Sequence, residues 1–394
     1  MLRRLWALLT ALFLVAGAAA AGPLTADMKR VEVIRGLTFL HDVRTVAIER
    51  STLRERLRNE MAKGMPYSTD DYAVVLRTLQ LVDGEKGDVF GRMLALYESQ
   101  VLAYYDPLAH VYYSISGLPA AISLAGDAKQ MHEFIKGIQI HELTHALQDQ
   151  RFHVGDRDRT LVHDTDGGLA YHALLEGEAS VVMLAYMLDK NGITLKDAVD
   201  NDSMMDTLTN AAGATDGSID ADTPRYFIES MKFPYLDGMR LVMLAYKRGG
   251  WKAVDALHAD PPRTTREVLH PDEYFARIDR GGAPAPDFKP LPFDGVANPL
   301  TVEHLGEFHW RFLVGEKSAT GWADDRVTIA EDSHCQPTVL AETRWDNAQE
   351  AEAFRSAYLA FLRGRGINPD FATDDNVVRF AYGADYVLMH RFIP

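Results

Sequence analysis

The sequence predicts an α+β protein in two parts, a mostly helical unit with a small sheet followed by a small α+β domain. Two long segments, 127–150 and 167–190, repeat apolar residues at helical spacing. Five of the chain's 17 prolines fall in the stretch 281–300, a density typical of an extended connector. Beyond it, short strand-like runs surround one helical segment, which suits a helix laid across a sheet. With 394 residues the chain is long enough to bury a large core.

The N-terminal residues 1–21 have the composition of a secretory signal peptide. Arg3 and Arg4 precede a short apolar run, Leu5 to Val15, and Ala19 to Ala21 supply the small residues before a cleavage site at Gly22. The apolar run is short for a transmembrane helix, so an uncleaved membrane anchor is the less favoured interpretation. We therefore expect an exported protein, periplasmic or secreted, with no membrane insertion after cleavage.

The charge of the chain argues against two classes of partner, and its cysteine content argues against disulfides. After cleavage the chain has 41 − 2 = 39 basic and 56 acidic side chains, so its formal net charge is 39 − 56 = −17. Nucleic acids and anionic membrane surfaces bind clusters of Lys and Arg, so neither is an expected partner. The mature chain holds a single cysteine, Cys335, and therefore no intramolecular disulfide.

The helical unit is expected to contain several helices and one hairpin. Residues 27–100 are mixed and mostly helical, and Ser68 to Asp71 form an N-cap cluster before the apolar-periodic run Tyr72 to Val82. Aromatic and β-branched residues then predict two strands around the turn Asp106-Pro107. The segment 167–190 is apolar nearly all round, which predicts a buried helix. The elements expected after residue 100 are strands at 101–105 and 111–115, and helices at 127–150, 167–190 and 224–248, the last interrupted at Pro234.

The last part of the chain, 301–394, is expected to form a separate small α+β domain. Strands are predicted at 327–329, 339–343, 377–382 and 386–392, with a helix at 347–362. The sequence of this domain shows no recognisable set of catalytic residues. The helical unit, 22–280, should therefore hold the functional site. Because the connector 281–300 is rich in proline, we expect a chain that ends near Ala283 to retain that site.

The sequence His141-Glu142-Leu143-Thr144-His145 lies within the first of the two long helical segments. Histidines four residues apart lie one turn above each other on one face of a helix, where both rings can bind one Zn²⁺ at ~2.0–2.1 Å. Glu142 is then placed to act as a general base on a metal-bound water. In the alternative interpretation, the two histidines only satisfy hydrogen bonds in the core.

Such a site needs a third protein ligand, and the second long helix offers Glu176 and Glu178. Side chains two residues apart on a helix point about 200° apart, so only one of them can face the metal. Small or polar residues share the face of Glu176, whereas Glu178 shares its face with a packing stripe of Leu and Val. Glu176 is therefore the expected ligand, and Gly177 beside it permits close approach of another helix. In the alternative, both glutamates are ion-paired structural residues.

A His-Glu-x-x-His helix followed by a glutamate on the next long helix resembles the gluzincins, the group that contains thermolysin and the alanyl-aminopeptidase type. The strings YYDP, HELTHALQDQ, EGEAS, FPYLDG and TTREVLHPDEY are similar to an uncharacterised bacterial and archaeal branch of this group, across residues 70–275. The resemblance implies a zincin-like fold and one catalytic Zn²⁺ held by His141, His145 and Glu176. It also implies hydrolysis of peptide bonds in a peptide or protein substrate.

The sequence departs from this group in two places. It lacks the Gly-x-Met-Glu-Asn motif of the aminopeptidases, so aminopeptidase activity is not implied. Ser180 stands where thermolysin-like proteins carry an aspartate that orients the first histidine ligand. A ligating histidine needs such a hydrogen-bond acceptor, and Gln148 and Asp149, one turn beyond His145, are the candidates. Both could instead belong to a solvated helix end.

Two residues are candidates for stabilising an oxyanion, a role that Tyr or His has in gluzincins. Tyr235 follows the interruption at Pro234, and His270 precedes Pro271. A neutral hydrogen-bond donor near zinc suits the charge that develops there. Tyr235 could instead pack beside the helix break, and His270 could cap a helix end.

The strand 111–115 precedes the metal-binding helix in the order seen in zincins, where an edge strand lines the substrate cleft. An edge strand can bind an extended peptide by strand addition, so we expect this strand to line the cleft. An ordinary core hairpin is the alternative.

The sequence thus predicts an exported zinc metallopeptidase in which Glu142 activates the attacking water. Two alternatives stay open, a catalytically silent envelope binding protein derived from the same fold and a zinc hydrolase that acts on a non-peptide bond. An intact Glu142 disfavours the binding protein, because binding alone needs no general base.

Overall fold

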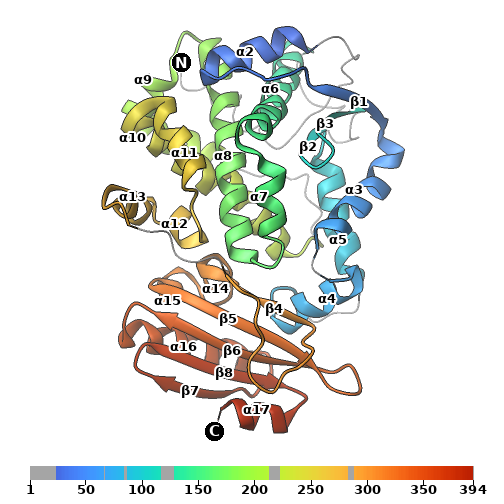
Figure 1. Ribbon diagram of the computed structural model, residues 1–394, viewed down its shortest axis with the longest axis vertical. Helices are drawn as coiled ribbons and strands as arrows, with labels where there is room; N and C mark the ends of the chain where they lie inside the picture. Colours follow the sequence, from blue (N-terminus) through green and yellow to red (C-terminus); the bar gives the residue numbers. More distant parts are fainter. Residues whose placement is uncertain are drawn as a thin grey trace.

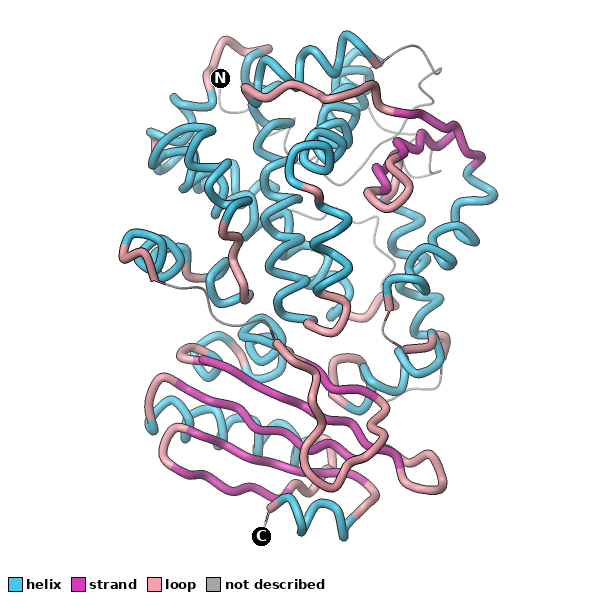
Figure 2. The backbone as a smooth tube through the Cα atoms, in the orientation of Figure 1, coloured by secondary structure: helices cyan, strands magenta, loops and turns pink. Residues whose placement is uncertain are grey.

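A computed structural model describes residues 24–65, 67–83, 87–116, 128–212, 222–282 and 288–393. The expected signal peptide, 1–21, lies outside these residues, as does 283–287 of the proline-rich connector. The chain is mostly helical up to the connector and then forms an α+β part built on one sheet (Figures 1 and 2). The fold class expected from the sequence is therefore confirmed.

The first part begins with helices that surround a three-stranded sheet in the order β1-β3-β2. β1 runs parallel to β3 and β2 runs antiparallel to it. The Ser68 side chain accepts a hydrogen bond from the Asp71 backbone N–H (3.1 Å), which is the expected N-cap of α4. The elements are α2 (Thr25–Arg35), β1 (Arg44–Glu49), α3 (Arg50–Gly64), α4 (Thr69–Thr78), α5 (Val89–Gln100), β2 (Ala103–Asp106) and β3 (Val111–Ser116).

The position of β3 corrects one expectation about the substrate cleft. The segment 111–116 is the central strand of its sheet, because β1 pairs with one side of it and β2 with the other. The sequence did not indicate β1 as a strand, so this second neighbour was missed. The edge strand that follows α5 and lies nearer the helix of His141 and His145 is β2, 103–106.

Eight helices follow in the described part of the chain before the connector, and α8 is the central one (Figure 1). It is buried along most of its length and packs between α6 and α11, as its all-round apolar sequence predicts. No helix in the described ranges combines the length and the apolar character needed to cross a membrane. The helices are α6 (Ala128–Phe152), α7 (Val154–Thr160), α8 (Thr165–Asp189), α9 (Leu195–Asp200), α10 (Asp202–Ala212), α11 (Arg225–Ala259), α12 (Thr265–Leu269) and α13 (Pro271–Asp279).

The helix α11 does not break where the sequence predicted. It continues through Pro234, which is buried, and its non-helical residues are Gly249 and Gly250. Gly250 has φ 64°, a conformation that glycine adopts without a steric penalty. Packing of the Pro234 region against α8 outweighs the lost backbone hydrogen bond, so tertiary contacts override local propensity here.

The crossing of α8 and α11 depends on two glycines. A methyl group placed on Gly177 would lie 2.2 Å from the carbonyl carbon of Gly238, and one placed on Gly238 would lie 1.9 Å from the carbonyl oxygen of Ala173. The two backbones therefore touch, as expected for Gly177. This close contact fixes the position of Glu176, the residue next to Gly177 on α8.

The last part is a five-stranded antiparallel sheet in the order β4-β5-β6-β8-β7, with α16 packed on it. The helix 347–362 and three of the four predicted strands are found there. Its elements are β4 (Thr301–Glu303), α14 (Gly306–Val314), α15 (Glu316–Ala319), β5 (Trp322–Glu331), β6 (Pro337–Trp345), α16 (Ala348–Gly364), β7 (Asp370–Asp374), β8 (Val377–Gly383) and α17 (Tyr386–Phe392).

The segment 386–392, predicted as a strand, is the helix α17. The Asp385 side chain accepts a hydrogen bond from the Leu388 backbone N–H (2.9 Å) and so caps the helix. Tyr386 and Val387 are exposed while Met389 is buried, a helical pattern that the aromatic and β-branched composition concealed. The short strand β7, at the edge of the sheet, was not predicted.

The two parts of the chain share one hydrophobic core across the connector. Apolar residues from both sides of the connector belong to a single cluster, in which the rings of Phe233 on α11 and Phe308 on α14 lie 4.8 Å apart. At the start of α8, the Asp166 backbone N–H donates to the carbonyl of His304 (2.9 Å). The last part therefore holds the N-terminal end of α8, which the proline-rich connector did not indicate.

Candidate metal site

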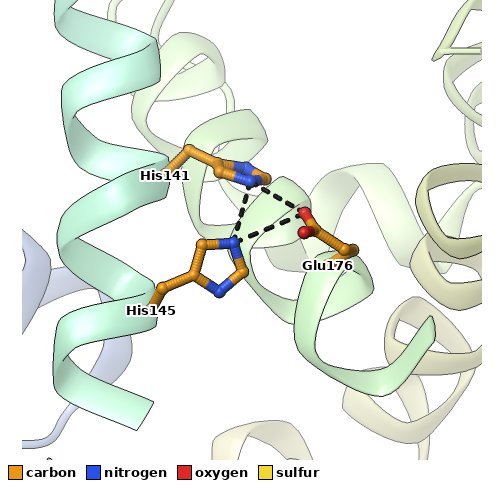
Figure 3. Close-up of side chains that lie close together, drawn as sticks. All are labelled: His141, His145 and Glu176. Atoms are coloured by element: carbon orange, nitrogen blue, oxygen red, sulfur yellow. Dashed lines mark hydrogen bonds and ion pairs between the residues drawn. The ribbon is translucent and has the colours of Figure 1, made fainter. Parts of the chain in front are cut away.

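Three side chains converge where α6 crosses α8 (Figure 3). His141 and His145 project from one face of α6, and Glu176 faces them from α8. The His141 Nε2 and His145 Nε2 atoms are 3.1 Å apart, and Glu176 Oε2 lies 3.0 Å from the first and 3.4 Å from the second. Among the residues that the structure describes, this is the only group of His, Cys, Asp or Glu whose atoms could jointly hold a metal ion.

The donor set and its spacing fit a zinc ion. Ligand atoms on a tetrahedral ion with bonds of ~2.0–2.1 Å lie about 3.3–3.4 Å from one another. The three separations in this site, 3.0, 3.1 and 3.4 Å, are close to that value. Two imidazoles and one carboxylate also form a ligand set of catalytic zinc sites, in which a fourth position stays open for water or substrate.

Electrostatics hold the three groups together and keep the carboxylate ionised. Burial alone would raise the pKa of Glu176, but His145 and His141 hold that pKa well below its ordinary value. Burial would lower the pKa of His145, yet the Glu176 carboxylate outweighs burial and raises this pKa to about 9. A metal ion bound at His145 must therefore displace a proton.

Glu142 lies between the two histidines in sequence. It lines a cavity that His141 and Glu176 also line. Its Oε2 accepts a hydrogen bond from the Tyr105 backbone N–H of β2 (2.9 Å), which fixes the carboxylate beside the cluster. Burial raises the pKa of Glu142, although the charges of His141 and His145 oppose this. A carboxylate with a raised pKa beside a site of this kind has the properties of a general base.

Gln148 is the residue that orients His145. The Nδ1–H of His145 donates to Gln148 Oε1 (2.8 Å), which leaves Nε2 free to face the cluster. The Gln148 amide in turn donates to Glu178 Oε2 (2.8 Å) and to the Leu175 carbonyl (3.0 Å), so both ends of the amide are engaged. Of the two candidates from the sequence, the structure selects Gln148.

Asp149, the other candidate, faces a different set of partners. Its Oδ2 accepts from the Tyr105 hydroxyl (2.8 Å) and contacts His110 Nδ1 (2.6 Å). Ser180 lines the cavity, and its buried hydroxyl has no hydrogen-bond partner in the described part of the chain. Ser180 therefore does not replace the orienting aspartate of thermolysin-like proteins.

Glu178 points away from His141, His145 and Glu176 into a buried network of charges. Arg35 from α2 pairs with its Oε1, and His258 Nε2 from α11 lies 2.5 Å from its Oε2. Burial would raise the pKa of Glu178, but Arg35 and His258 hold it well below its ordinary value. The structure thus assigns the two glutamates to opposite environments, as the helix geometry predicted, and Glu178 is the ion-paired one.

The two candidate oxyanion donors are placed very differently. Tyr235 lines the cavity, its ring stacks on His141 at 6.1 Å, and its hydroxyl hydrogen-bonds to Glu176. Burial and the nearby Glu176 carboxylate raise the pKa of Tyr235 well above 10, so the hydroxyl keeps its proton. His270 instead contacts Glu307 on α14 (2.8 Å) and does not line this cavity. The structure brings Tyr235 to the site and leaves His270 at the junction with the last part of the chain.

The cavity over the cluster has a volume of about 460 Å³ and mostly apolar walls. Four polar residues of its lining were not proposed for the site from the sequence, although one of them, His172, lies on the face of Glu176. They are Tyr97, Gln100, His172 and Ser230. His172 lies one turn before Glu176 on α8, and its Nε2 is 3.5 Å from Asp158 on α7. The i, i+4 spacing from Glu176 is the signal in the sequence that could have indicated His172.

Comparison with known proteins finds a family match for the last part of the chain. A family model described as a domain of unknown function (DUF8575) matches residues 296–391, which span β4 to α17. No curated protein and no solved structure matches the chain. The helical part, which contains the candidate metal site, lies outside the matched residues.

Proposed function

We propose that this protein is an exported zinc-dependent metallopeptidase of the gluzincin type. The observation that carries the proposal is the convergence of His141, His145 and Glu176 on one point, with Glu142 held in the same cavity. Export is proposed from the N-terminal sequence alone. The hydrogen bonds around His145 also support the proposal, because Gln148 fixes the tautomer of His145 and is itself held by Glu178.

His141, His145 and Glu176 would hold the zinc ion. When bound, zinc supplies a Lewis acid and lowers the pKa of water towards ~7. Glu142 accepts the proton of the attacking water, with its carboxylate oriented by the Tyr105 backbone N–H. The protonated Glu142 then donates this proton to the leaving amine. The Tyr235 hydroxyl, which stays protonated, donates a hydrogen bond to the carbonyl oxygen as negative charge develops on it.

The edge strand β2 supports binding of an extended peptide. In an antiparallel pair, alternate residues direct their N–H and C=O groups toward the partner strand. The Leu102 carbonyl accepts from Ile115 N (3.2 Å) on β3, whereas the Tyr105 N–H points to Glu142. The backbone groups of Ala103 therefore face the same side as Glu142, and Ala103 lines the cavity. A substrate strand paired there would pass across the candidate metal site.

The lining of the cavity supports cleavage within a chain rather than at its end. Exopeptidases need a charged group that binds the terminal amine or carboxylate of the substrate. The described residues around this cavity include no Lys or Arg, and their two carboxylates are Glu142 and Glu176. Both carboxylates have roles in the proposed chemistry. The remaining walls are mostly apolar, so side chains beside the cleaved bond are expected to be apolar.

Substitution of Glu142 tests the proposal. Glu142→Gln keeps the size of the side chain but removes the proton acceptor, so it should retain one zinc per chain and lose nearly all hydrolysis. Glu133→Gln is the matched control, because Glu133 lies on the same helix and pairs with Lys190 (3.1 Å) away from the cavity. Its activity should equal that of the wild type. The measurements are zinc content and cleavage of casein and of a peptide library.

Two outcomes would overturn the peptidase assignment. One is a zinc-loaded wild-type protein that cleaves neither casein nor any library peptide. The other is a Glu142→Gln protein that cleaves as well as the wild type at equal zinc occupancy. Zinc content below one per chain in the wild type would remove the metal assignment itself.

A further inference from the structure

A second cavity, of about 720 Å³, lies at the junction of the two parts of the chain. Its wall on one side is the turn between α7 and α8, and on the other side it is the paired strands β5 and β6. The connector contributes Phe288, whose ring stacks on that of His304 at 4.8 Å with an interplanar angle of 11°. The volume is within the range of roughly 300–1,000 Å³ found for small-molecule sites.

Cationic side chains from five separate segments meet in this cavity, although the chain as a whole has a formal net charge of −15. They come from α7, from the loop before α12, from the connector, from β5 and from β6. These residues are Arg157, Arg263, Lys289, Arg326 and Arg344.

In the part of the chain that the structure describes, three of these cations have no ion-pair partner, although the charge of Arg344 helps to lower the pKa of Asp324. Within the described residues, the side chains of Arg157, Lys289 and Arg344 form no hydrogen bond and no salt bridge, and Arg157 Nε is buried without a partner. Unpaired cations that face one cavity repel one another, and an anion between them removes that repulsion. Guanidinium groups also match the geometry of phosphate and carboxylate oxygens, to which they donate two parallel hydrogen bonds.

Each acidic residue of the cavity has a partner of its own. Asp325 accepts from the backbone N–H groups of Leu305 and Gly306 (both 2.8 Å) and from two Trp side chains. Glu342 pairs with Arg379 (2.7 Å). Asp164 contacts His304 Nδ1 (2.7 Å).

Asp324, the fourth acidic residue, is 3.5 Å from His304 Nε2 and stands opposite Arg344 in the β5–β6 pairing. His304 thus sits between two carboxylates, and its pKa is raised well above its usual value, because Asp164 and Asp324 together outweigh its burial. The cavity therefore carries a surplus of positive charge.

We infer that this junction cavity binds a small polyanion that carries at least two oxyanion groups, phosphate or carboxylate. At least two groups are required because the free cations enter from opposite walls, Arg157 from α7 and Arg344 from β6. This cavity is separate from the candidate metal site, and the inference does not depend on the proposed peptidase activity.

Calorimetric titration of the full chain tests this inference, with sodium pyrophosphate and sodium succinate as probes at constant ionic strength. Pyrophosphate should bind with saturation, and Arg344→Gln and Arg157→Gln should each weaken binding about tenfold or more, since each removes a charge-assisted hydrogen bond. Asp324→Asn should tighten binding, because it removes a competing negative charge. Arg355→Gln is the matched control and should change nothing, because Arg355 pairs with Glu352 on the exposed face of α16.

Pyrophosphate can also bind zinc, so the titration is repeated with His145→Ala, which removes a metal ligand but leaves the junction cavity intact. Saturable binding retained in His145→Ala and weakened by Arg344→Gln supports the inference, and tighter binding of succinate than of pyrophosphate would identify carboxylates as the natural groups. The inference fails if neither probe binds more strongly than chloride at the same ionic strength. It also fails if Arg344→Gln and Arg355→Gln bind equally well while thermal unfolding shows both to be folded.

Discussion

Glu176 and Glu178 show how two identical side chains on one helix acquire opposite roles. A rotation of about 200° along α8 turns one carboxylate toward His141 and the other toward Arg35 and His258. The two environments are nevertheless joined, because Gln148 bonds both to His145 and to Glu178. The buried ion pair thus helps to hold the amide that orients His145, a candidate metal ligand, which is a use of buried charge beyond stability.

Tyr235 has two possible roles at this site, and one substitution separates them. If its hydroxyl stabilises the oxyanion, Tyr235→Phe should lower kcat by roughly 10²–10³-fold and leave zinc affinity unchanged. If its hydroxyl only orients Glu176, the same variant should bind zinc more weakly, and kcat at full zinc occupancy should be close to normal. We expect the first result, because Tyr235 lines the cavity beside Glu142. Zinc affinity and kcat, measured on the same preparation, decide between them.

The convergence of the three candidate ligands could be predicted because the relevant geometry is local. Spacing of four residues places His141 and His145 together, and the small neighbours of Glu176 indicate its face. The partners of Glu178 could not be predicted, because Arg35 is 143 residues away in the sequence and His258 is 80 residues away. Contacts between residues so far apart in the sequence depend on how the helices pack. No local sequence pattern predicts them.

At the scale of elements, a strong apolar periodicity predicted the helices correctly, whereas amino-acid composition alone did not distinguish strands from helices. The two long helices carry the apolar repeats that predicted them. The strand β1 pairs with β3 across 67 positions and has an alternating but largely exposed face, so nothing nearby in the sequence marks it. The helix α17 has strand-like composition, yet the cap at Asp385 and a single buried face determine its conformation.

The contact between α8 and α11 leads to a prediction about Gly238. A methyl group there would lie 1.9 Å from the backbone oxygen of Ala173, so Gly238→Ala must push the two helices apart. We expect a loss of at least about 2 kcal/mol in the free energy of unfolding, together with weaker zinc binding, because Glu176 moves with α8. Urea unfolding and zinc titration measure the two effects.

Gly364→Ala is the control for this substitution. Gly364 ends α16, and no atom lies within 4 Å of a methyl group placed on it. Alanine should therefore be neutral or stabilise the helix by roughly 0.5–1 kcal/mol. Similar stability losses in Gly238→Ala and Gly364→Ala would show that the close helix contact does not carry the effect.

At the scale of the whole molecule, the start of α8 joins the two parts of the chain. Thr165 Oγ1 donates to Glu303 (2.6 Å), and the Asp166 carboxylate accepts from the Thr265 backbone N–H (2.9 Å). A methyl group on Gly306, which has φ 79°, would overlap Asp166. The helix that carries Glu176 is therefore held at its N-terminal end by residues of the last part of the chain.

Asp166 makes the stability of this junction depend on pH. Its side chain is fully buried, and burial raises its pKa to about 8, although His304 and the Thr265 hydrogen bonds oppose the shift. In the unfolded chain an aspartate has a pKa of about 3.9. The folded state therefore binds the proton more tightly, and this stabilising contribution is full below about pH 4 and is lost as pH rises from about 4 to 8.

Asp166→Asn should remove this dependence, because the amide does not titrate and its NH₂ group occupies the position of Oδ2, which has no hydrogen-bond partner among the described residues. Between pH 6 and pH 8 the wild type should lose roughly 1–3 kcal/mol of unfolding free energy that Asp166→Asn retains. The control is Asp156→Asn, an exposed residue of α7 paired with Arg159, and it should follow the wild type. Urea unfolding at pH 5, 6.5 and 8 gives the comparison. Wild-type and Asp166→Asn curves that stay parallel over this range would show that Asp166 is already ionised in the folded protein, held by His304 and the two Thr265 donors.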